Sequence, residues 1–145
     1  MEKIITQSAT ETKTLGQAIG QACRGGEVFS VSGNLGAGKT TFLQGLALGL
    51  GVAGRVNSPT FNILKIYKTK KGSTAKFFCH VDAYRLTGAK DLETLGIKEI
   101  LSAKDTVTAI EWAEKVKSIF PKNAIKIKAK HISDDEREFN IVDNR

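Results

Sequence analysis

The segment from Gly33 to Thr40 constrains this chain more than any other part of its sequence. It reads Gly-Asn-Leu-Gly-Ala-Gly-Lys-Thr and matches the phosphate-binding pattern G-x-x-x-x-G-K-[ST] at every fixed position. Residues 28–32 before it are typical of a buried strand, and residues 41–50 after it have the apolar face of a helix. A strand, a glycine-rich loop and a helix in this order direct backbone N–H groups at one point, where an anion can bind. The sequence therefore predicts a site for a nucleoside triphosphate.

Each residue type in this loop has a physical purpose. Glycines allow positive φ and let the backbone approach the phosphates closely. Lys39 is placed to reach the β- and γ-phosphates, and the Thr40 hydroxyl is placed to ligate Mg²⁺. The residues expected to bind the nucleotide here are Gly33, Asn34, Leu35, Gly36, Ala37, Gly38, Lys39, Thr40 and Thr41.

Length and composition favour a single domain spanning residues 1–145. The hydrophobic content of 41% and the charged content of 26% are ordinary for a soluble globular protein. No apolar run approaches the length of a membrane span, and the N-terminus does not resemble a signal peptide. Cys23 and Cys79 are isolated, which favours free thiols in a reducing compartment. We therefore expect a cytoplasmic protein without a membrane partner.

The net charge of +7 comes largely from two lysine-rich segments. One is residues 65–71, which lead into a predicted hairpin tip at Gly72. In the other, Lys126, Lys128 and Lys130 alternate with apolar residues and so share one face of a strand. The favoured interpretation is a solvated hairpin and an edge strand, whose lysines discourage pairing with another chain. The alternative is contact with nucleic acid or with an acidic partner.

The pattern along the chain predicts an α/β fold. Its core is P-loop NTPase-like, with a mostly parallel sheet, antiparallel hairpin additions and flanking helices. Ser8 and Glu11 have the spacing of a capping box at the start of a helix. The expected strands are 3–7, 28–32, 61–69, 76–81, 106–110, 124–132 and 138–142, and the expected helices are 8–23, 41–50, 91–95, 97–103 and 112–119.

Two acids follow apolar or β-branched runs and are candidates for nucleotide chemistry. Asp82 ends the run from Phe77, and Glu111 ends the run from Thr106. A P-loop NTPase needs a second acid at its Mg²⁺ ion and a group that orients the attacking water. The sequence leaves open which acid has which role. A cap or a surface salt bridge is the other interpretation of each acid.

Three further residues have two interpretations each. Thr60, after Pro59, is either a switch residue that reaches the γ-phosphate or Mg²⁺, or a threonine at a strand start. His80 is either a hydrogen-bonded core histidine or a functional one. Trp112 either stacks near the nucleotide or a partner, or packs in the core.

The nucleotide is expected to be ATP. No N-K-x-D motif and no suitable D-x-x-G motif accompany the loop, which argues against guanine specificity. A small-molecule kinase is one alternative function, but the arginines are scattered and form no lid-like cluster. A binding module that holds ATP without hydrolysing it is another. Asp82 and Glu111 argue against that second alternative.

Taken together, these segments resemble the bacterial TsaE (YjeE) family, and the resemblance covers nearly the whole chain. Its glycine-rich loop, switch segment, H-x-D-x-Y-R-L element, following helix and acid–tryptophan pair occur here in the same order. They are residues 36–42, 58–61, 80–86, 95–97 and 110–112. Asn34 stands where the family often has an acid, and Ala113 where it often has proline. Neither departure removes a phosphate or metal contact.

The resemblance implies a Mg²⁺-dependent ATPase that is weak alone and acts on a TsaD–TsaB complex. That system attaches threonylcarbamoyl to the adenosine beside the anticodon in tRNAs that read ANN codons. The resemblance also implies roles for single residues: Thr40 and Glu111 as Mg²⁺ ligands, Thr60 as the switch residue and Asp82 as a residue needed for hydrolysis. Thr12 aligns with a threonine in the N-terminal helix of the family, near the place where the adenine of ATP is expected to bind. Indirect or weak direct contact with tRNA remains an open expectation.

Overall fold

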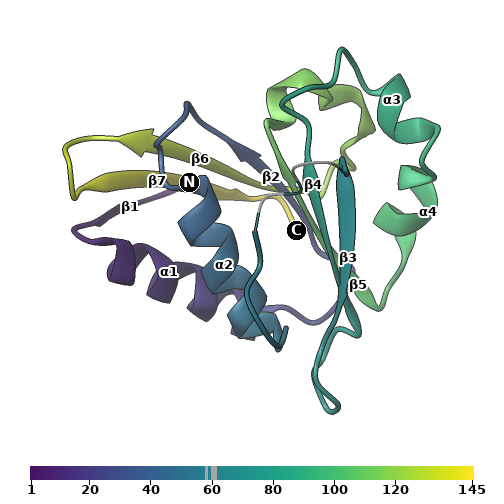
Figure 1. Ribbon diagram of the computed structural model, residues 1–145, viewed down its shortest axis with the longest axis horizontal. Coiled ribbons are helices and arrows are strands. Elements are labelled where there is room, and N and C mark those ends of the chain that lie inside the picture. Colours follow the sequence, from purple (N-terminus) through teal and green to yellow (C-terminus); the bar gives the residue numbers. More distant parts are fainter. Residues whose placement is uncertain (58, 60–61) are drawn as a thin grey trace.

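A computed structural model describes residues 1–57, 59 and 62–145. These residues form one seven-stranded sheet in the order β1-β7-β6-β2-β5-β4-β3, with helices on both of its faces (Figure 1). The strands are β1 (Glu2–Thr6), β2 (Val28–Ser32), β3 (Leu64–Lys68), β4 (Phe77–Asp82), β5 (Thr106–Glu111), β6 (Ile125–His131) and β7 (Arg137–Asp143). The α-helices are α1 (Ala9–Ala22), α2 (Lys39–Leu50), α3 (Lys90–Glu93) and α4 (Ile97–Ser102).

The sheet has a parallel centre and antiparallel edges. Strand β2 pairs in parallel with both β5 and β6, and β5 pairs in parallel with β4. The hairpins β3–β4 and β6–β7, together with β1 beside β7, add the antiparallel pairs. This arrangement confirms the predicted α/β class with hairpin additions. The parallel centre brings the carboxyl ends of β2, β4 and β5 to one edge of the sheet, where ligands bind in such folds.

The prediction that the lysine-bearing strand lies at an edge is wrong. Strand β6 lies inside the sheet, hydrogen-bonded to β2 on one side and to β7 on the other. Strand β7 pairs with the side of β6 that would otherwise be an edge, and β1 pairs with β7 beyond it. Its lysines therefore have no role in protecting a free edge. The other lysine-rich segment does lie at an edge, since β3 is the last strand of the order.

Helices α1 and α2 lie side by side against one face of the sheet (Figure 1). Glycines let their backbones approach unusually closely. A Cβ atom on Gly45 would lie 2.0 Å from the carbonyl oxygen of Lys13, and one on Gly16 would lie 2.2 Å from that of Phe42. Both distances are far below van der Waals contact, so only glycine fits at these positions. The close approach sets the position of α2, which carries the phosphate loop at its N-terminus.

Two clusters of buried side chains hold the helices on the sheet. The larger lies under α1 and α2 and includes Phe42 and Phe139, whose ring centroids are 5.4 Å apart. Burial of each such aromatic side chain contributes about 1.5–3 kcal/mol. The smaller cluster lies on the opposite face and joins β4 and β5 to α3 and α4, through Leu92 and Ile97 among others. The second layer of helices therefore covers the β4–β5 part of that face.

The helix expected at residues 112–119 is not present. Two short 3₁₀ turns, Ala113–Lys115 and Lys117–Ile119, take its place. Trp112 has φ 57°, the one non-glycine residue with positive φ in the described part of the chain, and Val116 interrupts the segment with φ −134°. Such backbone angles are incompatible with a continuous α-helix. Across the described residues, no helix combines the length and apolar character needed to cross a membrane.

Candidate nucleotide-binding site

The loop between β2 and α2 has the conformation that its glycines predict. Gly33, Gly36 and Gly38 have φ values of 140°, 77° and 98°, in a region that residues with a side chain rarely adopt. A Cβ atom on Gly33 would also lie 2.4 Å from the carbonyl oxygen of Ala129 on the neighbouring strand. The N-cap residue of α2 is Gly38, which has no side chain that could cap the helix. Backbone N–H groups at a helix N-terminus of this kind form an anion-binding site.

A cavity of about 350 Å³ lies in front of this loop. The loop with the start of α2, the ends of β4 and β5, and the start of β7 all contribute to its described lining. Asp82 and Glu111, at the carboxyl ends of β4 and β5, are direct neighbours in the strand register. Both line the cavity, so the structure brings the two predicted acids to the phosphate loop. The described residues that line it are Leu35, Gly36, Ala37, Gly38, Lys39, Thr40, Thr41, Asp82, Tyr84, Glu111, Trp112 and Arg137.

The Lys39 ammonium group lies folded over the loop. It donates hydrogen bonds to the carbonyl oxygens of Gly33 and Asn34, the latter at 3.0 Å, and lies 4.0 Å from the centroid of the Trp112 ring. Burial lowers the pKa of Lys39, while attraction to Glu111, Glu114 and Asp82 opposes that shift. The loop carbonyl groups and the tryptophan ring therefore compensate a partly desolvated cation.

Glu111 is held by a buried histidine. Its Oε2 atom lies 2.7 Å from Nε2 of His80, and the residues are 3% and 1% exposed. The two alternatives for His80 are thus not exclusive, because it is a core residue that contacts a site residue. This contact restricts the orientation of the Glu111 carboxylate. Within the described residues, Nδ1 of His80 has no hydrogen-bond partner.

Asp82 has a different environment. One of its oxygens accepts a hydrogen bond of 2.9 Å from the backbone N–H of Tyr84. Burial raises the pKa of the Asp82 carboxyl group; the Tyr84 N–H lowers it and the charge of Glu111 raises it further. The two acids therefore differ: Glu111 is buried and fixed by a side chain, whereas Asp82 is only half-buried.

Two aromatic residues and an arginine also line the cavity. The ring centroids of Tyr84 and Trp112 are 4.9 Å apart, with the rings tilted by 50°. Trp112 lines the cavity and also packs against the smaller core cluster, and its stacking on a nucleotide stays a prediction. Sequence reasoning missed Arg137, whose guanidinium donates to the carbonyl oxygens of Ser133, Asp134 and Glu136. The signal available was its position at the start of the last strand of a hairpin. An antiparallel strand begins at the edge where its parallel neighbours end.

Some predicted site residues lie elsewhere. Thr12 is buried, and its hydroxyl is 2.6 Å from that of Thr6. It is not part of the cavity lining, and its role near adenine stays a prediction. Gly33 and Asn34 are not among the described lining residues, and their carbonyl groups accept hydrogen bonds from Lys39. Thr60 lies outside the described residues. Among the described residues, no group of three or more His, Cys, Asp or Glu side chains could hold a metal ion.

The strand, loop and helix, with two acids on neighbouring strand ends, define an α/β protein of the P-loop class. The chain belongs to the family described as "Threonylcarbamoyl adenosine biosynthesis protein TsaE", whose model matches residues 6–139. This confirms the resemblance seen in the sequence. Proteins named "tRNA threonylcarbamoyladenosine biosynthesis protein TsaE" are similar over most of their length. The protein of Treponema pallidum is 34% identical over 97% of this chain and 99% of its own.

Two further comparisons agree. The protein of that name from Bacillus subtilis is 38% identical over 97% of this chain and 85% of its own. The crystal structure of YdiB from the same species has a TM-score of 0.80 and 31% identity, and it covers 99% of this chain and 86% of that one. Sequence and fold therefore agree on the family.

Proposed function

We propose that this chain is the ATP-binding and ATP-hydrolysing subunit of tRNA threonylcarbamoyladenosine synthesis, acting together with TsaD and TsaB. Family membership supports the pathway. The observation that supports the chemistry is the cavity in which the phosphate loop meets Asp82 and Glu111. In a P-loop NTPase, positioning and charge stabilisation supply almost all of the catalysis, and these groups are of the kind that supplies both.

The residues present fit ATP with Mg²⁺. Backbone N–H groups of residues 36–41 would hold the phosphates, and Lys39 would exchange its carbonyl partners for phosphate oxygens. The Thr40 hydroxyl and the Glu111 carboxylate are oxygen ligands, which Mg²⁺ prefers. When bound, Mg²⁺ would neutralise charge on the β- and γ-phosphates.

The different environments of the two acids suggest a division of roles. Glu111, buried and restrained by His80, suits a metal ligand that keeps its place. Asp82, half-buried and with a raised pKa, suits orientation of the attacking water and acceptance of its proton. We therefore assign the metal to Glu111 and the water to Asp82.

The test is Mg²⁺-dependent ATP hydrolysis by the purified chain, measured with and without a TsaD–TsaB pair. We expect low activity alone, stimulation by the pair, and a loss of about 100-fold or more in Glu111→Ala. Lys39→Ala should lose ATP binding while remaining folded. Glu93→Ala, at an exposed acid on α3, is the matched control and should behave as the wild type.

Two results would contradict the proposal. If Lys39→Ala bound ATP as well as the wild type, the site would be assigned to the wrong residues. If the wild type bound ATP but showed no hydrolysis in either condition, a binding module that does not hydrolyse ATP would be the better description.

A further inference from the structure

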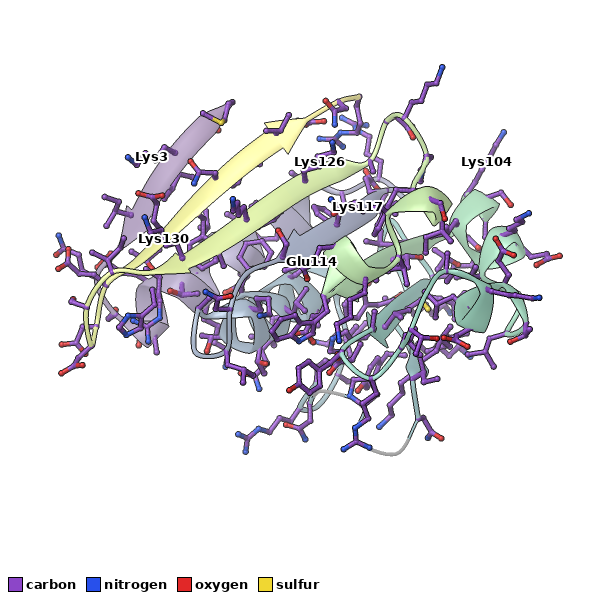
Figure 2. All side chains as sticks on the ribbon, turned by 90° about the horizontal axis from the view of Figure 1, so that it is seen from above. Lys3, Lys104, Glu114, Lys117, Lys126 and Lys130 are labelled. Atoms are coloured by element: carbon purple, nitrogen blue, oxygen red, sulfur yellow. The ribbon has the colours of Figure 1, made fainter. Side chains whose placement is uncertain are left out.

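The face of the sheet opposite α1 and α2 carries a row of lysines. Lys126, Lys128 and Lys130 of β6 all point to this face, since the alternate residues of β6 pack in the core under the helices. Lys3 of β1 joins them, because it pairs in register with Asn140, which itself pairs with Lys128. Figure 2 views this face from above, with Lys3 on β1, Lys126 and Lys130 on β6, and β7 between the two strands.

This basic face, defined by Lys3, Lys126, Lys128 and Lys130, is exposed and only partly neutralised. The three β6 lysines are exposed and make no ion pair within the described part of the chain. Lys3 pairs with Glu138 at 3.3 Å, and Glu138 also stands opposite Lys130 in the strand register, where the two charges attract each other. Along β6, successive lysines on one face are about 6.7 Å apart, so their charges repel one another. A row of unpaired cations on an interior strand costs stability and is not explained by edge protection.

The basic face continues into a hollow of about 850 Å³. Lys126 and Lys128 line it from the sheet, and Lys117 and Lys122 line it from the segment after β5. Glu114 is the one acid among the described lining residues. Figure 2 shows Glu114 and Lys117 on that segment and Lys126 on β6. The hollow is thus positively charged on two sides.

Polar groups lie between these cations. Ser30 and Ser32 of β2 pair in register with Lys126 and Lys128, and Asn140 of β7 pairs with Lys128 from the other side. All three side chains line the hollow. Hydroxyl and amide groups interspersed with lysines are the usual donors to the phosphates and sugars of a nucleic acid. A regular repeat along an extended strand also suits a partner whose charges repeat along a chain.

We infer that this basic face and hollow bind the phosphate backbone of RNA. The choice of RNA among polyanions rests on the proposed role in tRNA modification. The predominance of lysine on this face favours RNA over an acidic protein as the partner. Protein–protein interfaces are depleted in lysine, and most of their binding energy comes from aromatic and arginine side chains. Backbone recognition of this kind is not sequence-specific and depends strongly on salt.

The test is binding of an unmodified tRNA transcript by the full chain between 50 and 400 mM salt. Lys126→Gln/Lys128→Gln removes two cations of the basic face. Lys70→Gln/Lys71→Gln removes two exposed lysines at the β3–β4 hairpin tip and is the matched control for net charge. Loss of two phosphate contacts should weaken binding about 20- to 60-fold near 0.1 M salt and reduce the slope of log K against log salt by about 1.5. The control should match the wild type.

Three outcomes would overturn the inference. Equal weakening by both double variants would mean that only net charge acts. If the wild-type chain did not bind the tRNA transcript at 50 mM salt, the basic face would not be an RNA-binding site. If the β6 variant bound RNA normally but lost the TsaD–TsaB pair, the face would bind protein. ATP binding and hydrolysis, measured on the same samples, separate this question from the proposed function. A wild-type chain that hydrolyses ATP but does not bind RNA would contradict this inference alone. A wild-type chain that binds RNA through the basic face but does not hydrolyse ATP would contradict the proposed function alone.

Discussion

Replacement of Gly45 by alanine tests whether the close approach of α1 and α2 positions the phosphate loop. The new Cβ would lie 2.0 Å from the carbonyl oxygen of Lys13 and 2.8 Å from its carbonyl carbon. Both atoms belong to the backbone of α1, so no side-chain rotation can relieve the clash. The helices must therefore move apart.

Two effects of opposite sign decide the stability of Gly45→Ala. Alanine favours the helix over glycine by about 1 kcal/mol. Overpacking costs about 1–3 kcal/mol, and here the upper half of that range applies because backbone meets backbone. We therefore expect the free energy of unfolding to fall by about 1–2 kcal/mol. For a domain of this size, that lowers Tm by about 3–8 °C.

The same displacement should reach the nucleotide site. Helix α2 begins at Lys39, so a shift of α2 moves Lys39 and Thr40 relative to Asp82 and Glu111 on the sheet. A misplacement of about 1 Å in catalytic geometry can cost on the order of 100-fold in rate. ATP hydrolysis with the TsaD–TsaB pair should accordingly fall more than stability alone explains, at a temperature where the variant is fully folded.

Thermal and urea unfolding followed by circular dichroism measure the first effect, and the ATPase assay measures the second. Gly88→Ala is the control, since a Cβ there meets nothing within 4 Å and Gly88 does not have positive φ. Its stability should stay the same or rise slightly. If Gly45→Ala were as stable as the wild type or more so, helix propensity would outweigh packing and the close contact would be refuted.

Two other predictions concern buried groups. Burial raises the pKa of Cys23 and of Cys79 to about 12. Neither thiol should therefore react with iodoacetamide in the folded protein between pH 7 and 9, whereas both should react in denaturant. Rapid labelling of the native chain, followed by mass spectrometry, would contradict this. His80→Phe removes the group that restrains Glu111, and the Mg²⁺ concentration for half-maximal hydrolysis should rise about tenfold or more. An unchanged Mg²⁺ requirement, measured by titration at saturating ATP, would show that His80 only packs.

Short-range patterns in the sequence were sufficient for most of the elements and for the centre of the site. Residues 28–32 are a strand as predicted, and α2 follows the loop. The predicted cap is present, with the Glu11 N–H donating to the Ser8 hydroxyl at 3.0 Å. Asp82 and Glu111 do end strands beside the loop. These features depend on backbone preferences, turn residues and periodicity within a few positions, all of which are local.

Contacts between segments that are distant in the sequence could be identified only from the tertiary structure. The interior place of β6, the entry of Arg137 into the cavity and the pairing of His80 with Glu111 each depend on which strands become neighbours and in what register. The glycines of α1 and α2 show the same limit. Gly16 and Gly20 on α1, like Gly45 and Gly49 on α2, have a four-residue spacing that is visible in the sequence, but the sequence does not show which helix they face. A strand's own residues do not specify its neighbours, because the free energy that selects them comes from burial and pairing summed over the whole fold.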